Sequence, residues 1–231
     1  MRLAILIPAF NEEKTIGAVL KSLPKTLPQV TEIEVVVVSD GSRDQTVNIA
    51  KKFGATVIEH DLNRGLGGAL GTGFEYAKMN DFDCLLTFDA DGQHSHRDIW
   101  PVLRPIVYKK ADVSIGSRLK DHKGMPWYRV MGIWGLNIIT YLFFWVWTTD
   151  SQSGLRAFSK KAIHAINIQA NRMEVSSEFF YEAGKKDLKI TEVQIESIYT
   201  QYSLNKGIGK GQFRHGFRIL AKMAYRRLFS K

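Results

Sequence analysis

The sequence predicts an α/β fold in which a mainly parallel sheet is covered by helices on both faces. In residues 1–118, short and continuously apolar runs alternate with segments whose apolar residues recur at helical spacing. Strands that are apolar at every position are typical of parallel sheets buried on both sides. The alternation of strands and helices indicates βαβ units, in which successive strands run parallel.

The predicted elements of the first half follow one another without a long linker. Residues 3–7 form the first strand, and Ile16, Val19, Leu20 and Leu23 then recur at the spacing of a helix. The further predicted strands are residues 33–38, 56–58, 84–88 and 113–115. The further predicted helices are residues 45–53, 67–79 and 99–108.

The second half has a different pattern. Residues 130–149 carry no charged side chain and include six aromatic residues, Trp134, Tyr141, Phe143, Phe144, Trp145 and Trp147. A helix is expected at residues 174–185, a strand at 192–198 and a basic amphipathic helix at 213–229.

Length and composition restrict the class of protein. A chain of 231 residues suffices for one α/β domain with a small appendage. Hydrophobic residues make up 45% and charged residues 24%, which argues against disorder. A single cysteine, Cys84, excludes an intrachain disulfide. The formal net charge of +9 favours an anionic partner: a phosphorylated substrate, an anionic membrane or nucleic acid.

Polar clusters follow four of the predicted strands. They are Asn11 to Glu13, Ser39 to Ser42, Asp89 to His94, and Gly116 to Arg118. Ligands of open α/β sheets bind beyond the carboxyl ends of the strands. The convergence of four clusters on one edge therefore predicts an active site there.

Asp89 and Asp91 are the candidate metal ligands. Two carboxylates one residue apart at a strand end suit Mg²⁺ or Mn²⁺, which would bridge diphosphate oxygens. Gln93 could add an oxygen and His94 a nitrogen. The alternative is a surface turn whose aspartates cap the next helix.

The other clusters also have two interpretations. Asp40 could bind a nucleotide base or ribose, or it could cap the following helix in competition with Ser42 and Asp44. Asn11 to Glu13 could simply cap the first helix. Arg118 could bind phosphate or be a solvated surface charge.

The glycine-rich stretch at residues 63–71 matches neither G-x-G-x-x-G nor G-x-x-x-x-G-K-S/T. Its glycines are expected to permit close packing of a helix or close approach of a ligand.

Taken together, the motifs resemble the inverting family-two glycosyltransferases of GT-A fold, and most closely the dolichol-phosphate mannose synthase and polyprenyl-phosphate glycosyltransferase group. The matching segments occur in the expected order over nearly the whole chain. They are IPAFNEE, VVSDGSRDQT, NRGLGGALGTGF, FDADGQH, IGSR, MPWYR, DSQSGLRAFS and VSSE.

The resemblance implies a role for each matching residue. Those that would bind the nucleotide-sugar are Pro8, Phe10, Glu12, Val38, Asp40, Asp89, Ala90, Asp91 and Lys206. Asp89, Asp91 and Gln93 would hold Mg²⁺ or Mn²⁺, and Ser117, Arg118 and Arg129 would bind the acceptor phosphate. Asp89, Asp91, Arg118 and Arg129 would be the catalytic set. Because the acceptor phosphate is already ionised, inverting transfer would need alignment and charge neutralisation rather than a strong base.

Three positions depart from the family pattern. Ser39 stands where the first aspartate of Asp-Asp-Gly-Ser is usual, Leu66 replaces a lysine, and Tyr202 replaces an arginine. These departures weaken any assignment of mannose or guanine specificity. The segments DSQSGLRAFS and VSSE look more like those of relatives that use UDP-sugars.

Residues 130–149 are long enough to span a bilayer. However, Arg129 and residues 150–156 belong to motifs that must share one side, so we expect a helix lying in the membrane interface. A buried core helix is the alternative. The helix expected at 213–229 would bind an anionic lipid surface or pack as an ordinary helix.

The sequence thus predicts one GT-A domain, with residues 1–118 binding the nucleotide-sugar and residues 119–231 binding the acceptor and the membrane. The expected partners are a nucleotide-sugar, a polyprenyl or dolichyl phosphate and the cytoplasmic face of a membrane, without nucleic acid. Two rival functions remain. One is a transferase acting on a non-lipid acceptor, and the other is an inactive membrane- or nucleic-acid-binding module.

Overall fold

A computed structural model describes residues 1–119, 127–144, 147–170 and 175–196. The helix expected at 213–229 and Lys206 lie outside these residues. The strands are β1 (Arg2–Ala9), β2 (Glu32–Ser39), β3 (Thr56–Glu59), β4 (Cys84–Thr87), β5 (Val113–Ser117), β6 (Arg156–Ser159) and β7 (Ile190–Gln194). The helices are α1 (Ile16–Ser22), α2 (Thr46–Lys52), α3 (Leu66–Met79), α4 (Ile99–Val107), α5 (Trp127–Phe144), α6 (Lys160–Ala165) and α7 (Val175–Lys185), with a 3₁₀ turn at His96–Asp98.

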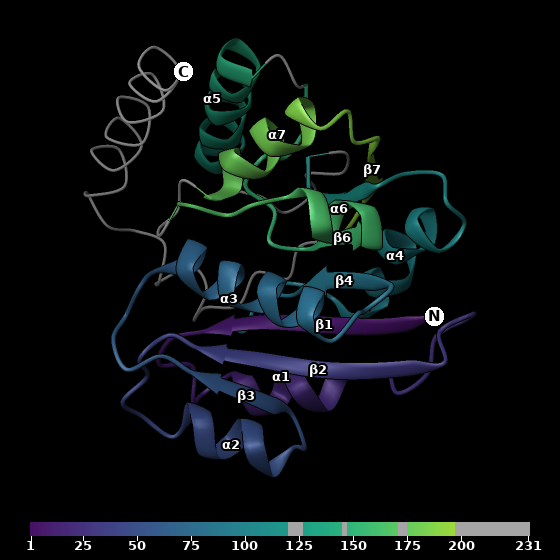
Figure 1. Ribbon diagram of the computed structural model, residues 1–231. Helices are drawn as coiled ribbons and strands as arrows, with labels where there is room; N and C mark the ends of the chain where they lie inside the picture. Colours follow the sequence, from purple (N-terminus) through teal and green to yellow (C-terminus); the bar gives the residue numbers. More distant parts are fainter. Residues whose placement is uncertain (120–126, 145–146, 171–174, 197–231) are drawn as a thin grey trace.

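The seven strands form one sheet in the order β3-β2-β1-β4-β6-β5-β7 (Figure 1). Strands β3, β2, β1 and β4 pair in parallel, and so do β5 and β7. Strand β6 is antiparallel to both of its neighbours, β4 and β5. The α/β, mainly parallel prediction is confirmed, and strands from both halves of the chain share the sheet.

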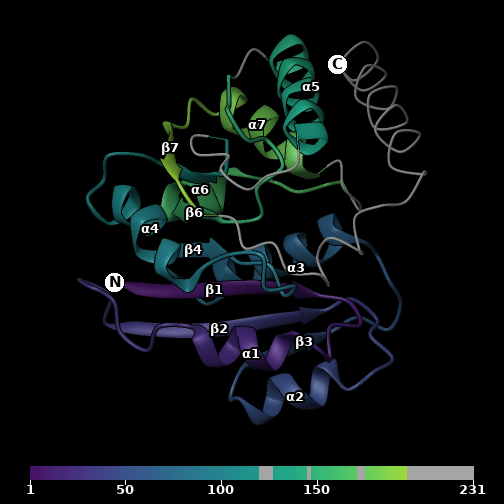
Figure 2. The same ribbon diagram turned by 180° about the vertical axis from the view of Figure 1, so that it is seen from behind.

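The core has two layers, one on each face of the sheet. On strand β1, Leu3, Ile5 and Ile7 pack with α1, α2 and α4, while Ala4 and Leu6 pack with α3, α6 and α7. Figure 1 looks at the face that α3 and α6 cover, and Figure 2 shows α1 and α4 behind it. Burial on both faces explains why β1 is apolar at successive positions.

Helix α3 lies very close to the sheet. A Cβ atom at Gly73 would clash with the side chain of Leu6 on β1. Glycine at this position, two residues beyond the glycine-rich stretch at 63–71, therefore allows α3 to pack close against β1.

Two expectations for the second half need correction. Strand β6 was not predicted, because four residues between a turn and a short helix give little periodicity. Strand β7 begins at Ile190, two residues before the predicted start, and ends at Gln194.

Candidate active site

The polar clusters converge on one edge of the sheet. Strands β1 and β2 end in register, with Ala9 opposite Ser39, and β4 runs parallel beside β1. Strand β5 also points the same way as β4, because β6 is antiparallel to both. The loops after β1, β2, β4 and β5 therefore leave the sheet at the same edge, as the sequence predicted.

Asp40, at the end of β2, is buried and organises the loop before α3. Its carboxylate accepts hydrogen bonds from the backbone N–H groups of Arg64 at 2.9 Å and Gly65 at 2.7 Å. It also contacts Nδ1 of His60 at 2.8 Å, and Nε2 of His60 contacts Oγ1 of Thr72 at 2.9 Å. Asp40 does not cap α2, since Asp44 accepts from the N–H of Thr46. Sequence analysis missed His60, whose role becomes visible only when β3 and α3 meet.

The loop after β1 is joined to the loop after β2. Oδ1 of Asn11 accepts from the N–H of Arg43 at 2.9 Å, and Oε2 of Glu13 accepts from the N–H of Gln45 at 3.1 Å. The N–H of Glu12 donates to Oγ1 of Thr46 at 2.8 Å. These residues were considered as caps of α1, but the structure shows them tying two loops together.

The expected nucleotide-binding residues differ in accessibility. Phe10 is 47% exposed and Pro8 is partly exposed, so both can meet a ligand. Glu12 and Ala90 are buried. Val38 is fully buried in the core beneath α3, so its side chain cannot contact a nucleotide in this arrangement.

Asp89 and Asp91 follow β4 and differ in their surroundings. Oδ2 of Asp89 contacts Nε2 of the buried His94 at 2.9 Å. Burial raises the pKa of Asp89, but the hydrogen bond and charge of His94, with Arg118 and Arg156, lower it overall. Burial, followed by the charge of Asp89, raises the pKa of Asp91. The two carboxylates therefore repel each other, and a bound cation would offset this repulsion.

The donor set fits a small hard cation with ligands supplied in part by a substrate. Gln93 donates its backbone N–H and its Nε2 group to Asp91, at 3.0 and 2.8 Å. Gln93 thus orients Asp91, while the Nε2 atom of the buried His94 is engaged by Asp89. Within the described ranges, no group of three or more His, Cys, Asp or Glu side chains could hold a metal. Mg²⁺ is commonly held by one or two carboxylates plus substrate phosphates, which matches this pair.

Arg118, just beyond β5, forms a bidentate ion pair with the fully buried Asp150. Its Nε lies 2.7 Å from Oδ2 and its Nη2 lies 2.9 Å from Oδ1 of Asp150. The Arg118 side chain keeps 18% exposure, so the solvated-charge alternative does not describe it. Asp150 was only part of a motif in the sequence, and its role as the partner of Arg118 was not foreseen.

Ser117 departs from its expected role. It is fully buried, and its hydroxyl lies 2.6 Å from that of Thr149. Oε2 of Glu192 on β7 accepts from the same Thr149 hydroxyl at 2.7 Å. Ser117 therefore offers no exposed hydroxyl to a phosphate and instead holds the segment that carries Asp150. Arg129 lies in the first turn of α5, and its side chain is outside the described part of the structure.

Arg156, at the start of β6, is a buried cation behind Asp89. Its guanidinium donates to the backbone carbonyls of Ser151, Ser153 and Ser176. It also lies over the ring of Phe179, 5.0 Å from the centroid. Burial lowers its pKa to about 10, so it remains charged at neutral pH. Sequence analysis noted the motif DSQSGLRAFS. Nothing in the motif indicated that its arginine would be buried close to Asp89.

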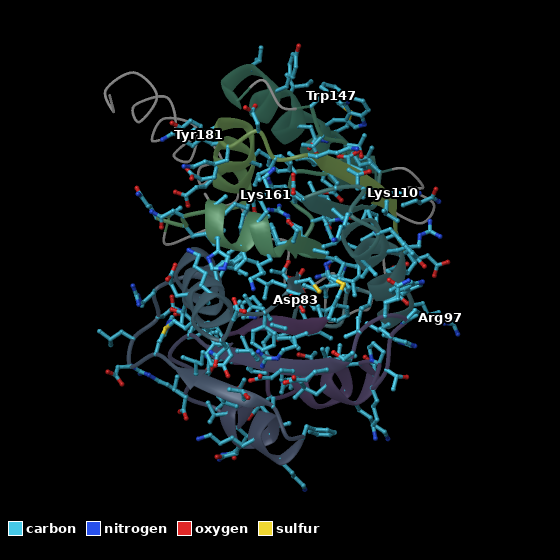
Figure 3. The ribbon with its side chains drawn as sticks, turned by 45° about the vertical axis from the view of Figure 1, so that its right-hand side comes forward. Asp83, Arg97, Lys110, Trp147, Lys161 and Tyr181 are labelled. Carbon is cyan, nitrogen blue, oxygen red and sulfur yellow. The ribbon has the colours of Figure 1, made fainter. Side chains whose placement is uncertain are left out.

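Helix α5 presents an apolar stripe away from the domain. Met131, Trp134, Ile138, Tyr141 and Leu142 are all exposed and share one helical face. Outside this stripe, Asn137 is buried and bonds the backbone of Thr149 and Ser151. Trp147 extends the stripe, with its ring 5.6 Å from that of Tyr141, and it points outward in Figure 3.

The described part of α5 is thus not the buried core helix considered as an alternative. Across the residues whose structure is described, we find no helix both long and apolar enough to cross a bilayer.

Known proteins resemble this chain over most of its length. Residues 4–170 match the family model of glycosyl transferase family 2. The chain is 47% identical to an uncharacterized protein of Methanocaldococcus jannaschii, over 97% of this chain and 92% of that protein. It is 38% identical to a UDP-N-acetylglucosamine–dolichyl-phosphate N-acetylglucosaminyltransferase of Methanococcus voltae, over 95% and 93%.

A solved structure supports the fold. Glucosyl-3-phosphoglycerate synthase from Mycobacterium tuberculosis, solved with Mn²⁺, UDP and phosphoglyceric acid, superposes with a TM-score of 0.73. The match covers 97% of this chain and 78% of that chain at 18% identity, which indicates a shared fold. The family match, the relatives and the fold agree, and this chain belongs to glycosyl transferase family 2.

Proposed function

We propose that this protein transfers a sugar, with inversion, from a nucleotide-diphosphate sugar to the phosphate of a polyprenyl or dolichyl lipid. The observation that carries the proposal is the placement of Asp89 and Asp91 at the end of β4, beside the Arg118–Asp150 pair. This arrangement offers a carboxylate site for a metal-bound diphosphate next to a cation for a second phosphate. The relative from Methanococcus voltae, whose name specifies a dolichyl-phosphate acceptor, supports the choice of acceptor.

The reaction forms one bond and breaks another at the anomeric carbon. An oxygen of the acceptor phosphate attacks that carbon from the face opposite the leaving group, and the nucleotide diphosphate departs with the bonding electron pair. The phosphate oxygen is already ionised at neutral pH, so no base is required. The residues of this chain must align the two substrates and offset their negative charges.

The side chains at the ends of β4 and β5 would have separate roles in this reaction. Asp89 and Asp91, with the side-chain oxygen of Gln93, would hold Mg²⁺ or Mn²⁺, while His94 and the Nε2 group of Gln93 orient the two carboxylates. A bound ion would supply charge neutralisation for the departing diphosphate. Arg118, with Arg129, would bind the acceptor phosphate, and Asp150 fixes the direction of the Arg118 guanidinium.

The nucleotide would lie over the loops after β1 and β2. Pro8 and Phe10 would contact it directly, and Lys206 would close over the donor. Asp40 would shape this region through the loop at Arg64 and Gly65, since its carboxylate is already occupied by their N–H groups and by His60.

The acceptor lipid requires a membrane surface close to the site. The exposed stripe of α5 supports peripheral binding, because tryptophan and tyrosine favour the headgroup region of a bilayer. Asn137 connects α5 to the segment that carries Asp150 and Arg156, so the helix would present the lipid phosphate to the site. We place the protein on the cytoplasmic side, with residues 1–118 binding the donor and residues 119–231 binding the acceptor.

The test is sugar transfer to polyprenyl phosphate from a panel of radiolabelled UDP- and GDP-sugars, with Mn²⁺ or Mg²⁺. The wild type should form labelled lipid, and Asp91→Ala should reduce the rate at least about 100-fold. Transfer only to soluble acceptors would favour a different transferase. Salt-dependent nucleic-acid binding without turnover would favour a binding module.

A further inference from the structure

Arg156 is the first residue of β6, the strand that lies between β4 and β5. In the register of the sheet it pairs with Thr87 on β4 and with Ile115 on β5. Asp89 follows Thr87 by two residues, and Arg118 follows Ile115 by three. Arg156 therefore lies between the strand end that carries the proposed metal ligand and the strand end that carries the proposed acceptor cation. The inference drawn from this placement rests on the proposed function.

A connecting turn at residues 150–154 contacts both strand ends. At its first residue, the buried Asp150 accepts from Nε and Nη2 of Arg118 at 2.7 and 2.9 Å and from the backbone N–H of Arg118 at 3.1 Å. At its last residue, Gly154 packs so closely against the Asp89 carboxylate that a Cβ atom there would clash with it. The distance between Asp150 and Gly154 therefore influences the distance between the acceptor site and the donor site.

The guanidinium of Arg156 holds this turn at two points. Its Nε donates to the carbonyl of Ser153 at 2.9 Å, and its Nη2 donates to the carbonyl of Ser151 at 2.8 Å. Ser151 adjoins Asp150, and Ser153 adjoins Gly154. Because the guanidinium is planar and rigid, its two nitrogens keep a fixed separation, and so do the two carbonyls that they bind.

Neighbouring elements hold Arg156 and the turn in place. Arg156 is 3% exposed, and its guanidinium lies over the rings of Phe179 and Phe180 on α7, 5.0 and 5.4 Å from their centroids. The hydroxyl of Thr87 donates to the carbonyl of Gly154 at 2.7 Å, so β4 provides a separate anchor at the donor end of the turn. The turn is thus bound both by β6 and by β4.

Inverting transfer depends on the spacing of the two sites. The acceptor oxygen must approach the anomeric carbon to about 3–3.5 Å, and a misplacement of about 1 Å can cost about 100-fold in rate. Hydrolysis of the donor has a weaker requirement. A water oxygen bonds to the anomeric carbon and gives its proton to solvent, and the nucleotide diphosphate leaves with the electron pair. Water does not need the Arg118 cation to bring it to that carbon.

We propose that Arg156 is a positioning residue that sets the spacing between the donor site at Asp89 and the acceptor site at Arg118. It acts through the turn at residues 150–154 rather than through contact with a substrate. Its replacement therefore impairs transfer to the acceptor phosphate more than it impairs donor binding or donor hydrolysis. A residue that only stabilised the fold would affect transfer and hydrolysis equally.

The first variant is Arg156→Lys, which keeps a positive charge near Asp89 but replaces the rigid guanidinium with a single ammonium group. Transfer from UDP-N-acetylglucosamine to polyprenyl phosphate, and hydrolysis of the same donor without acceptor, are measured with Mn²⁺, and calorimetry gives the donor affinity. Another donor takes its place if the panel described above selects one. Transfer should fall about 30- to 100-fold, whereas hydrolysis and donor affinity should change less than about threefold.

Arg2→Lys is the matched control. Arg2 also donates to a backbone carbonyl, that of Asn80, and its guanidinium lies over the ring of Phe82 and pairs with Glu32. It is the first residue of β1, so it lies at the edge of the sheet opposite the active site. Its replacement should change transfer and hydrolysis by less than about twofold.

Thr87→Val tests the same turn from β4 and decides the question if Arg156→Lys does not fold. It removes the hydroxyl that binds the carbonyl of Gly154, and the ratio of transfer to hydrolysis should fall about three- to tenfold. Transfer by Arg156→Lys near the wild-type rate, or equal losses of transfer and hydrolysis in the two variants, would overturn the positioning role while leaving sugar transfer intact. An absence of transfer by the wild type from any donor, including GDP-sugars, would overturn the proposed function itself.

Discussion

Nδ1 of His60 lies 2.8 Å from Oδ1 of Asp40, and both side chains are buried. The other ring nitrogen of His60 reaches Thr72 on α3, so one imidazole joins the ends of β2 and β3 to the helix above them. Asp40 in turn receives the N–H groups that precede α3. The imidazole therefore holds the loop that is expected to shape the nucleotide site.

Replacing His60 should destabilise the protein and weaken donor binding. His60→Leu leaves Asp40 and Thr72 without a buried partner, and we expect a loss of about 1–3 kcal/mol in the free energy of unfolding. Urea denaturation measures this loss, and the KM for the nucleotide-sugar should rise. His164→Leu is the control, because His164 is exposed on α6 and its removal should change neither quantity. Equal stabilities of the two variants would show that the Asp40–His60 contact is not structural.

Gly154 leaves room for the carboxylate of Asp89. A Cβ atom at this position would clash with both carboxylate oxygens. Gly154→Ala should therefore displace Asp89 and reduce the transfer rate about 100-fold. Gly135→Ala, on an open side of α5, should retain activity and gain about 0.5–1 kcal/mol in stability. If Gly154→Ala kept an activity near the wild-type level, the position of the Asp89 carboxylate would not matter for the reaction.

Asp91 should reduce the stability of the metal-free protein. Burial and the charge of Asp89 raise its pKa, so the folded state binds more protons than the unfolded state between the ordinary carboxyl pKa and the raised one. Stability is lost as the pH rises through that window. Asp91→Asn should therefore melt at a higher temperature than the wild type in chelator at neutral pH, and the gap should shrink as the pH falls.

Asp44 provides a comparison of opposite sign. Burial raises its pKa, but hydrogen bonds from Thr46 and Glu13 outweigh this effect and lower the pKa overall. Its stabilising contribution is present above the ordinary carboxyl pKa and is lost as the pH falls through the lowered value. Asp44→Asn should thus melt below the wild type, by an amount that stays constant from about pH 6 to 8. An Asp44→Asn gap that changes between about pH 6 and 8, or an Asp91→Asn variant less stable than the wild type at neutral pH in chelator, would contradict this account.

The apolar stripe of α5 should determine membrane binding. Trp134→Ser and Leu142→Ser each remove exposed apolar area from the stripe, and we expect about tenfold weaker binding to vesicles containing anionic lipid. Sedimentation with the vesicles measures this. Phe53→Ser removes a similarly exposed aromatic residue next to α2, at the end of the molecule opposite α5 in Figure 1, and should bind as the wild type does. Equal losses in all three variants would exclude a specific role for α5.

Much of the fold could be predicted from the local pattern of apolar residues along the chain. Strands β1, β2 and β4 are apolar at successive positions because helices cover both faces of the sheet. This pattern can be recognised directly in the sequence. The bounds of α3 and α7 were predicted to within one residue. The convergence of Asn11, Asp40, Asp89 and Arg118 on one edge followed from the same reasoning, since parallel strands carry their carboxyl ends to the same side.

The sequence by itself determined the class of fold, the edge that carries the site and the residue types gathered there. Tertiary structure decided which partner each of those residues takes. Strand β6 enters antiparallel between β4 and β5, bringing Arg156 behind Asp89 and the segment before it beside Arg118. His60, Asp150 and Arg156 each contact a residue 20 or more positions away in the chain, and the spacing of apolar residues gives no information about such contacts. Periodicity reports which face of an element is apolar, whereas hydrogen bonds between distant segments depend on how the faces pack.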